Sequence, residues 1–502
     1  MSAKKSNKRG REKNGATATN HDKTPLLDTL LAHAKRKVVS FHTPGHKNGR
    51  GIDKKLASYV GREIFQLDVT VFPEVDSLHD PTGPIKKAQE LFADAYGVEK
   101  SFFLVNGSSV GNMAMIMSAC RPGESLIISR NSHKSTLGGI VMSGVWPIWV
   151  QPTVDQNLDI LFDSSPEQIE QALKRFPEAK AVFVTSPTYN GVATNLKRIA
   201  EICHARGKML LVDEAHGAHL KFHPSLPMSA VDAGADLVVQ STHKTLAAIS
   251  QGSVLHFNSK LIDPSRVKRI ISMLQTTSPN YATLASLDLA RWQMVSQGKG
   301  ILEKLIQNCD RARGQINQLK DFTCITRPNM QGRGYDLDAT KLTINVTRTG
   351  YSGQDISEML TKDYNIQVDA ADLFNLIAIT GTGTDRSDLD RLVAALTELD
   401  KIKQGGAQNW VFNIPSLSTE LVMNPRDVFL LYRSKRVPLR KAIGHICAQP
   451  LTPYPPGIPV LIPGERVTAE IVDYLEDLNE RAVRVSGQEA EELKTVKVVA
   501  SH

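Results

Sequence analysis

Two stretches decide the fold: residues 208–216, KMLLVDEAH, and residues 237–245, LVVQSTHKT. Each begins with a short apolar run and ends on polar side chains that can take part in chemistry. Short, continuous apolar runs are typical of strands that are buried on both faces of a parallel sheet. The sequence therefore predicts two strands of one such sheet, with Asp213 and Lys244 at their carboxyl ends.

The pattern around these stretches alternates between strands and helices from about residue 84 to residue 258. Strands are expected at residues 101–105, 125–129, 181–185, 208–212 and 237–240, and helices at residues 84–96, 110–119 and 196–206. Short apolar strands that alternate with helices predict an α/β fold, in which helices cover both faces of a largely parallel sheet.

The rest of the chain predicts four further segments around a large domain at residues 84–290. A basic tail, residues 1–23, precedes an N-terminal segment, residues 24–83, in which Thr24 and Pro25 are expected to begin a helix that runs to residue 37. Residues 265–320 are expected to be helical and to lead into a small α+β domain within residues 291–403. A turn cluster at residues 404–407 then opens a C-terminal α+β domain, residues 404–502, which carries a proline-rich loop at residues 453–457.

The distribution of charge, apolar residues and cysteines favours a protein of the cytoplasm. The net charge of +8 is concentrated in the tail, where seven lysines and arginines face two acidic residues. Such a polar tail without aromatic residues is expected to be disordered. No apolar run approaches the ~20 residues that cross a bilayer. The five scattered cysteines form no CxxC pair, which predicts reduced thiols in the core.

Three motifs in chain order predict a site for pyridoxal 5'-phosphate. Asn106-Gly107-Ser108-Ser109 follows a strand and opens a helix, where free N–H groups bind phosphate. Asp213 is placed to keep a pyridinium nitrogen protonated, which maintains the ring as an electron sink. Lys244 can form an imine with an aldehyde, and Ser241 and His243 beside it add donors for the phosphate.

The motifs also resemble those of the fold-type-I ornithine/lysine/arginine decarboxylases, from about residue 24 to residue 480. The resemblance rests on residues 41–47 (FHTPGHK), 106–109 (NGSS), 131–135 (NSHKS), 213–219 (DEAHGAH), 241–245 (STHKT), 454–459 (YPPGIP) and 463–465 (PGE). It implies a short form of that family, without the additional N-terminal wing domain that the large enzymes use to build decamers. At His216 some larger relatives carry an aromatic residue, which affects the expected pocket.

The resemblance implies a role for each site residue. The expected catalytic residues are Lys244, which binds the cofactor covalently, Asp213, which holds the ring nitrogen, and His133, which stacks on the ring. The other expected cofactor-binding residues are Ser108, Ser109, Ala215, His216, Ser241, His243 and Thr277. Thr277 lies in residues 275–279, which in the family cross a dimer interface to the partner's phosphate. The distal cation of the substrate is expected to meet Glu465, or an acid of residues 75–80, Asp76 or Asp80.

These implications predict decarboxylation of a basic L-amino acid, arginine before lysine or ornithine, by a homodimer or larger homo-oligomer with shared active sites. An aminotransferase or a lyase on the same fold remains an alternative, with Arg348 and Arg386 as candidates for binding an α-carboxylate. No specific nucleic acid and no membrane are expected as partners, although the basic tail leaves a nucleic-acid binder as an alternative.

Two other interpretations concern residues 213–223. The letters DEAH also occur in helicases, but no phosphate loop containing Gly-Lys-Ser or Gly-Lys-Thr accompanies them. His216, His219 and His223 with Glu214 are candidate zinc ligands. We expect no metal there, since Gly217 and the strand end argue against the helix that such sites use.

Overall fold

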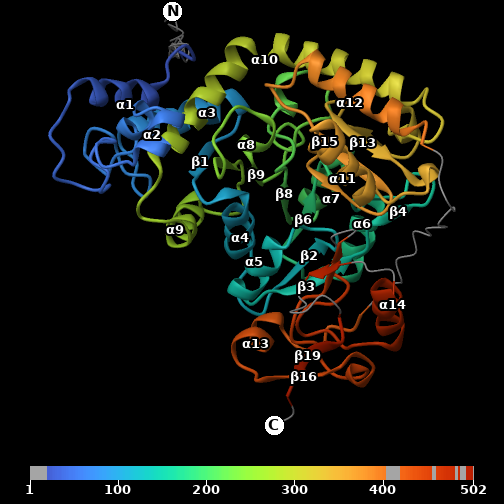
Figure 1. The fold of residues 1–502 in the computed structure, drawn as a ribbon. Coiled ribbons are helices and arrows are strands. Elements are labelled where there is room, and N and C mark those ends of the chain that lie inside the picture. Colours follow the sequence, from blue (N-terminus) through green and yellow to red (C-terminus); the bar gives the residue numbers. More distant parts are fainter. Residues whose placement is uncertain (1–19, 403–418, 455–458, 481–483, 487–492, 501–502) are drawn as a thin grey trace, which may run out of the picture.

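The computed structural model describes residues 20–402, 419–454, 459–480, 484–486 and 493–500. Most of the expected basic tail, the turn cluster at residues 404–407 and residues 455–457 of the proline-rich loop lie outside these ranges. The described chain forms a central sheet with a hydrophobic core on each face, followed by a small domain and a C-terminal domain that each have a core of their own (Figure 1).

The central sheet has seven strands in the order β1-β10-β9-β8-β6-β2-β3. Its strands are β1 (Lys100–Leu104), β2 (Ser125–Ser129), β3 (Trp146–Val150), β6 (Ala181–Thr185), β8 (Met209–Asp213), β9 (Leu237–Gln240) and β10 (Ser253–Phe257). β10 pairs antiparallel with both neighbours, and the other pairings are parallel. The predicted α/β fold with a largely parallel sheet is confirmed, and all five expected strands form.

Helices cover both faces of this sheet, because successive residues of each buried strand point to opposite sides. In β8, Met209 and Leu211 pack in the core beneath α4 (Gly107–Ala119), α5 (Ser135–Ser143) and α9 (Pro264–Leu274). Leu210 and Val212 pack in the core on the other side. That core is covered by α1 (Pro25–Lys35), α3 (Pro84–Tyr96), α6 (Pro166–Arg175), α7 (Leu196–His204) and the start of α10 (Tyr281–Ile316).

The long helix α10 connects the large domain with the small domain (Figure 1). Leu284 and Leu287 pack against the central sheet, whereas Leu302 and Ile306 pack in the core of the small domain. The helical expectation for residues 265–320 is wrong at residues 275–280, where a loop separates α9 from α10.

The small domain contains a four-stranded sheet in the order β11-β13-β15-β14, covered by helices α11 (Gly353–Tyr364) and α12 (Arg386–Leu399). Its strands are β11 (Thr323–Cys324), β13 (Lys341–Asn345), β14 (Ala370–Ala371) and β15 (Asn375–Ile379). The C-terminal domain lies below β3 in Figure 1, where α13 (Pro425–Leu430) and α14 (Ala469–Glu480) accompany the paired strands β16 (Ser434–Pro438) and β19 (Thr495–Val499).

Shorter elements complete the described chain. They are α2 (Lys54–Val60), α8 (Thr242–Thr245), β4 (Thr153–Asp155), β5 (Ile160–Phe162), β7 (Val192–Thr194), β12 (Tyr335–Leu337), β17 (Thr452–Tyr454) and β18 (Arg484–Ser486). Across the described ranges, none of the helices combines the length and the apolar character needed to span a bilayer.

The structure also tests the predictions made for the N-terminal helix and for the cysteines. Pro25 occupies the first turn of α1, as expected, but Thr24 does not cap the helix with its side chain. Instead, the backbone N–H and the hydroxyl of Thr24 both donate to the carboxylate of Asp28. All five cysteines are buried and free, which confirms that they are core residues.

Candidate active site

The carboxyl ends of several strands bring the predicted motifs to one edge of the central sheet. β1 and β9 each pair antiparallel with β10, so they run in the same direction as β8, β6 and β2. The loops that follow β1, β2, β8 and β9 therefore emerge at the same edge. These loops carry Ser108 and Ser109, His133, Asp213 with Ala215, and Ser241 to Lys244. In open α/β sheets, ligands bind at this edge.

Asp213 is buried at the end of β8 and is held from two sides. Its Oδ2 accepts a hydrogen bond from Asn112 Nδ2 at 2.7 Å, and its Oδ1 accepts one from the Ala215 N–H at 3.0 Å. Asn112 also donates to Ser135 Oγ, which lies 2.8 Å from His133 Nδ1. The carboxylate is thus fixed in position, and it retains lone pairs that can accept a further N–H.

Lys244 lies half-buried just beyond β9. Its Nζ is 3.0 Å from His216 Nε2. Burial lowers the pKa of Lys244, while the negative charges of Asp213 and Asp369 raise it in part. At neutral pH, Lys244 is therefore present as the free amine more often than an exposed lysine is. The free amine is the form that attacks an aldehyde.

His133 lies on the open side of this edge, where its side chain is exposed. Desolvation lowers its pKa, Asp213 raises it, and Lys244 lowers it again. The backbone N–H of Ser135 donates to Nδ1 at 3.2 Å, which leaves Nε2 to carry the proton of a neutral ring. A neutral ring close to both Asp213 and Lys244 has the flat surface that stacking on a cofactor ring needs.

The neighbouring loops form a cradle for a phosphate. α4 begins at Gly107, whose φ of +76° suits glycine, and Ser108 and Ser109 occupy its first turn. Across from it, the hydroxyls of Ser241, Thr242 and Thr245 are buried and have no hydrogen-bond partner within the described ranges. Buried hydroxyls are normally paired, so these orphaned donors fit a bound phosphate. His243 Nδ1 lies 3.0 Å from the Gly252 carbonyl oxygen.

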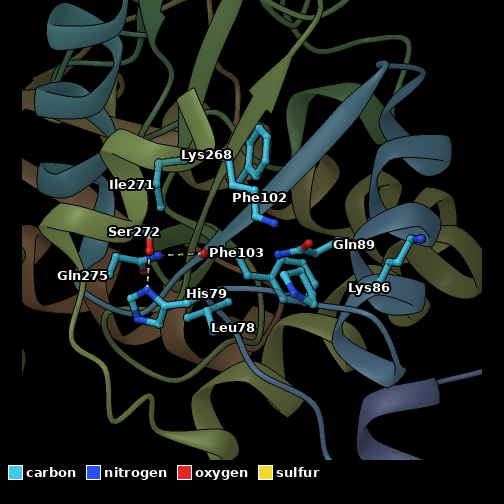
Figure 2. A pocket seen from close by; sticks show the side chains of 11 residues that line it. Leu78, His79, Lys86, Gln89, Phe102, Phe103, Lys268, Ile271, Ser272 and Gln275 are labelled. Carbon is cyan, nitrogen blue, oxygen red and sulfur yellow. Dashed lines mark hydrogen bonds between the residues drawn. The ribbon is translucent and has the colours of Figure 1, made fainter. Parts of the chain in front are cut away.

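Thr277 lies exposed in the loop between α9 and α10, and hydrogen bonds of the neighbouring residues hold that loop in place. The backbone N–H of Thr276 donates to Asn106 Oδ1 at 3.2 Å. On the opposite side, His79 contacts Ser272 Oγ at 2.6 Å and the Thr276 carbonyl oxygen at 2.8 Å. Figure 2 shows His79 beside Ser272 and Gln275 in a pocket under this loop. His79 was not predicted as a site residue, and it fixes the loop that carries Thr277.

The structure does not bring Glu465 into this cluster. Both of its carboxylate oxygens bind the guanidinium of Arg130, at 2.5 and 2.9 Å, and both side chains are fully buried. One of those oxygens also accepts the Ile462 N–H at 2.9 Å. In this chain the carboxylate is enclosed and paired, which gives Glu465 a structural role, and the expected substrate-binding role stays a prediction.

Asp76 and Asp80 are likewise engaged elsewhere. The buried carboxylate of Asp76 accepts hydrogen bonds from five backbone N–H groups, those of Ser77, Thr82, Gly83, Ile85 and Lys86. Several of these are the unpaired donors at the start of α3. Asp80 is exposed and pairs with Lys268 at 2.7 Å. Asp76 therefore caps the start of α3 in this structure, and its expected substrate-binding role stays a prediction.

Replacing Asp76 by asparagine is expected to lower the free energy of unfolding by about 1–3 kcal/mol, because an amide cannot accept all five N–H groups. Asparagine tolerates the positive φ of this position, so the change isolates the carboxylate. Urea denaturation measures the effect, with Asp80→Asn as the exposed control. Unchanged stability together with a raised KM would restore Asp76 as a substrate-binding residue.

The candidate zinc ligands in residues 213–223 each have a different partner in the structure. His216 contacts two lysines, His219 pairs with Asp338, and His223 with Glu303. Glu214 accepts hydrogen bonds from Ser229, Ala230 and Gln240. Within the described ranges, no group of such side chains is arranged to hold a metal ion. The two arginines of the aminotransferase alternative, Arg348 and Arg386, are exposed and bind Thr323 and Asp390.

Besides His79, Thr242 and Thr245, sequence reasoning missed two further residues that the structure adds to the site. Asn112 holds Asp213, and its position four residues after Ser108 places both on one face of α4, which is a usable signal. Lys341 is buried at the start of β13, with its Nζ 3.0 Å from His216 Nδ1. A lysine that opens an apolar strand carries no sequence signal of this kind.

The fold is that of the fold-type-I enzymes, a class whose members depend on pyridoxal phosphate. Residues 24–388 match the family described as Orn/Lys/Arg decarboxylase, major domain, and residues 408–498 match its C-terminal domain. The chain belongs to the Orn/Lys/Arg decarboxylase family, whose members are carboxy-lyases.

Similar proteins of known name cover nearly the whole chain. An arginine decarboxylase of Halalkalibacterium halodurans is 41% identical over 96% of this chain and 98% of its own. An arginine decarboxylase of Bacillus subtilis is 39% identical over 95% and 98%. The crystal structure of the Francisella novicida lysine decarboxylase LdcF, at 23% identity, covers 95% of this chain and 81% of its own with a TM-score of 0.82, and confirms the fold.

Proposed function

We propose that this chain decarboxylates a basic L-amino acid, with L-arginine as the preferred substrate, using pyridoxal 5'-phosphate. The observation that carries the proposal is the position of the half-buried Lys244 amine, beside the fixed Asp213 carboxylate and close to orphaned hydroxyls. Membership of the decarboxylase family supports the reaction, and the arginine decarboxylases at 39–41% identity support the substrate.

Each residue at the sheet edge would bind a different part of the cofactor. Ser108, Ser109, Ser241 and His243 would hold the phosphate, and the exposed Thr277 would reach the phosphate of a partner subunit. His133 and Ala215 would contact the two faces of the ring, Asp213 its nitrogen, and Lys244 its aldehyde carbon. Bound there, the cofactor supplies a sink for the electron pair that the departing carboxylate leaves behind.

The side chains of the protein then have two tasks, which are to stabilise charge and to transfer one proton. Asp213 would place its negative charge at the ring nitrogen and would stabilise a positive charge there. Loss of CO2 leaves an electron pair at the α-carbon, which one proton must neutralise. Lys244, once its Nζ is free, would deliver that proton as a general acid, because it interacts electrostatically with Asp213 and His133, which would hold the ring.

The decisive experiment is product formation by purified protein with added pyridoxal phosphate and L-arginine, L-lysine or L-ornithine in separate reactions. Mass spectrometry would detect agmatine, cadaverine or putrescine. Agmatine as the dominant amine is the expected result. If none of the three amines forms although the cofactor is bound to Lys244, the result would favour an aminotransferase or lyase activity instead.

Replacing Asp213 by asparagine is expected to lower kcat roughly 10²–10³-fold, because an amide does not stabilise the protonated ring nitrogen. The visible spectrum of the bound cofactor should shift as well, since it reports the ring's protonation. Asp232→Asn, an exposed residue paired with Lys221, is the matched control. Wild-type kcat in Asp213→Asn would remove the proposed role.

We further propose a homodimer with shared active sites in the cytoplasm. Thr277 is exposed and carries a hydroxyl that its own chain leaves open to solvent. Light scattering on the purified protein tests the assembly, and mixing Lys244→Ala with Thr277→Ala subunits tests the sharing. An active monomer would contradict both statements.

A further inference from the structure

The free amine of Lys244 is one end of a network of three residues. Its Nζ lies 3.0 Å from His216 Nε2, and on the other side of the same ring Lys341 Nζ lies 3.0 Å from Nδ1. His216 and Lys341 are buried. One imidazole therefore joins two amines, of which one follows β9 in the large domain and the other begins β13 in the small domain.

The chemistry of these groups restricts where the protons reside. A neutral imidazole has one N–H donor and one acceptor nitrogen, and an ammonium group only donates. His216 must therefore accept a hydrogen bond from one lysine and donate one to the other, which has to be a free amine. Burial lowers the pKa of His216 well below its ordinary value, and the charges of Lys341 and Lys244 lower it further, so the ring is neutral at physiological pH.

Two proton arrangements satisfy every hydrogen bond of this network. In the first, the Lys341 ammonium donates to Nδ1 of His216, and its Nε2–H donates to the amine of Lys244. In the second, the ammonium is on Lys244, the amine is on Lys341, and the ring is the other tautomer. A proton can thus pass from one lysine to the other without leaving a buried polar group unpaired, which would cost about 1–3 kcal/mol.

We propose that Lys341 and His216 form a proton relay, which supplies Lys244 with the proton that replaces the substrate carboxylate at the α-carbon. The inference rests on the proposed decarboxylation, which takes up one proton for each CO2 released. The Lys341 N–H bond breaks as the Nδ1–H bond of His216 forms, and the Nε2–H bond breaks as a new N–H bond forms on Lys244. Lys244 then gives that proton to the electron pair at the α-carbon. Lys341 and His216 act through Lys244 and are positioning residues.

The surroundings suit a lysine that gives up its proton. Burial lowers the pKa of Lys341 to about 8, with Asp338 and Asp369 raising it and Lys244 lowering it. The titratable or charged groups that face the network from the described elements are Asp213, Asp338, Asp369, His133, His219 and Tyr189. Asp369 is exposed, accepts a hydrogen bond from the Tyr189 hydroxyl and raises the pKa of Lys341 through its charge, so an exposed carboxylate interacts electrostatically with the buried lysine.

Three variants separate a relay from a fixed positive charge. Lys341→Met removes the charge and the proton at nearly constant volume. Lys341→Arg keeps the charge but does not release a proton, because a guanidinium stays protonated in proteins. His216→Phe keeps a ring without nitrogen. Thermal unfolding checks that each variant folds, and Lys341→Met with His216→Phe preserves the test if arginine does not fit the buried position.

The first readout needs no turnover. Cofactor-free protein is mixed with pyridoxal phosphate across a range of pH, and the appearance of visible absorbance gives the rate at which the Lys244 amine reacts. Lys341→Met is expected to shift this rate profile upward by about one pH unit, because it removes both the positive charge and the hydrogen-bonded chain that favour the free amine of Lys244. His216→Phe removes the hydrogen-bonded chain but keeps the charge of Lys341, so its upward shift should be smaller. Lys341→Arg should react like the wild type, because its charge still holds Lys244 as the free amine. An unshifted profile in Lys341→Met would overturn the relay, whatever reaction the enzyme catalyses.

The second readout is the dependence of kcat on pH with the preferred substrate. The wild-type kcat is expected to fall as the pH rises through about 8, where Lys341 loses its proton. Lys341→Arg should lower kcat on the order of 10²-fold or more and abolish this alkaline decline. Wild-type kcat in Lys341→Arg, or a change confined to KM in Lys341→Met, would overturn the relay in favour of a cation that binds the substrate carboxylate. A wild type that binds the cofactor but produces no amine would instead refute the proposed function.

Discussion

Replacing Lys244 by alanine is expected to abolish the covalent attachment of pyridoxal phosphate and to lower decarboxylation by at least roughly 10³-fold. The variant lacks both the amine that reacts with the aldehyde and the acid proposed to protonate the α-carbon. Borohydride reduction followed by peptide mass spectrometry measures the attachment, because reduction makes the bond between lysine and cofactor permanent. In the wild type the added mass should lie on the peptide that contains Lys244.

The matched control is Lys174→Ala, an exposed lysine on α6 that pairs with Glu170. It should keep the wild-type label, visible absorbance and activity. Lys244→Ala should unfold at nearly the wild-type temperature, since its side chain is only half-buried. Activity that persists in Lys244→Ala, with the label on another lysine, would contradict the central assignment.

The central sheet could be predicted because its signals are local. Every expected strand is a short run of apolar residues, and the buried strands β6, β8 and β9 match this pattern closely. β3 escaped prediction because it contains Pro147, and proline occurs in sheets mainly at an edge, which is where β3 lies. β10 escaped because Ser253 and His256 interrupt its apolar pattern, although both side chains are buried.

The candidate site was predicted where one loop carries the relevant residue. Asp213 and Lys244 follow strands whose direction is fixed by the fold, so their convergence could be inferred before any coordinates. The partners of Glu465 and His216 could not be inferred in this way, because they are far away in the sequence. Arg130 lies 335 positions from Glu465, and Lys341 lies 125 positions from His216. No local pattern reveals that a carboxylate is already neutralised or that an imidazole connects two amines. A motif therefore predicted that Glu465 matters, but it could not distinguish a substrate ligand from a buried ion pair.

The Arg130–Glu465 pair gives the second large effect. Arg130 follows β2 and precedes the loop of His133, and its guanidinium also donates to the carbonyl oxygens of Pro459 and Val460. The pair thus connects the C-terminal domain to the sheet edge that carries the site. Glu465→Ala is expected to lower the free energy of unfolding by about 3–5 kcal/mol, because it leaves a buried guanidinium without its counter-charge. Urea denaturation at constant slope measures the loss.

The double variant Arg130→Met with Glu465→Met separates a structural role from recognition of the substrate. Two apolar side chains of similar volume often replace a buried ion pair without loss of stability, so the double variant should recover most of what Glu465→Ala loses. With the fold restored, its KM for L-arginine should stay close to the wild-type value, since the Glu465 carboxylate is fully buried and paired with Arg130. If the double variant is stable but its KM rises tenfold or more, a loss of about 1.4 kcal/mol in substrate binding, then Glu465 does contact the substrate, and the C-terminal domain must open to expose it.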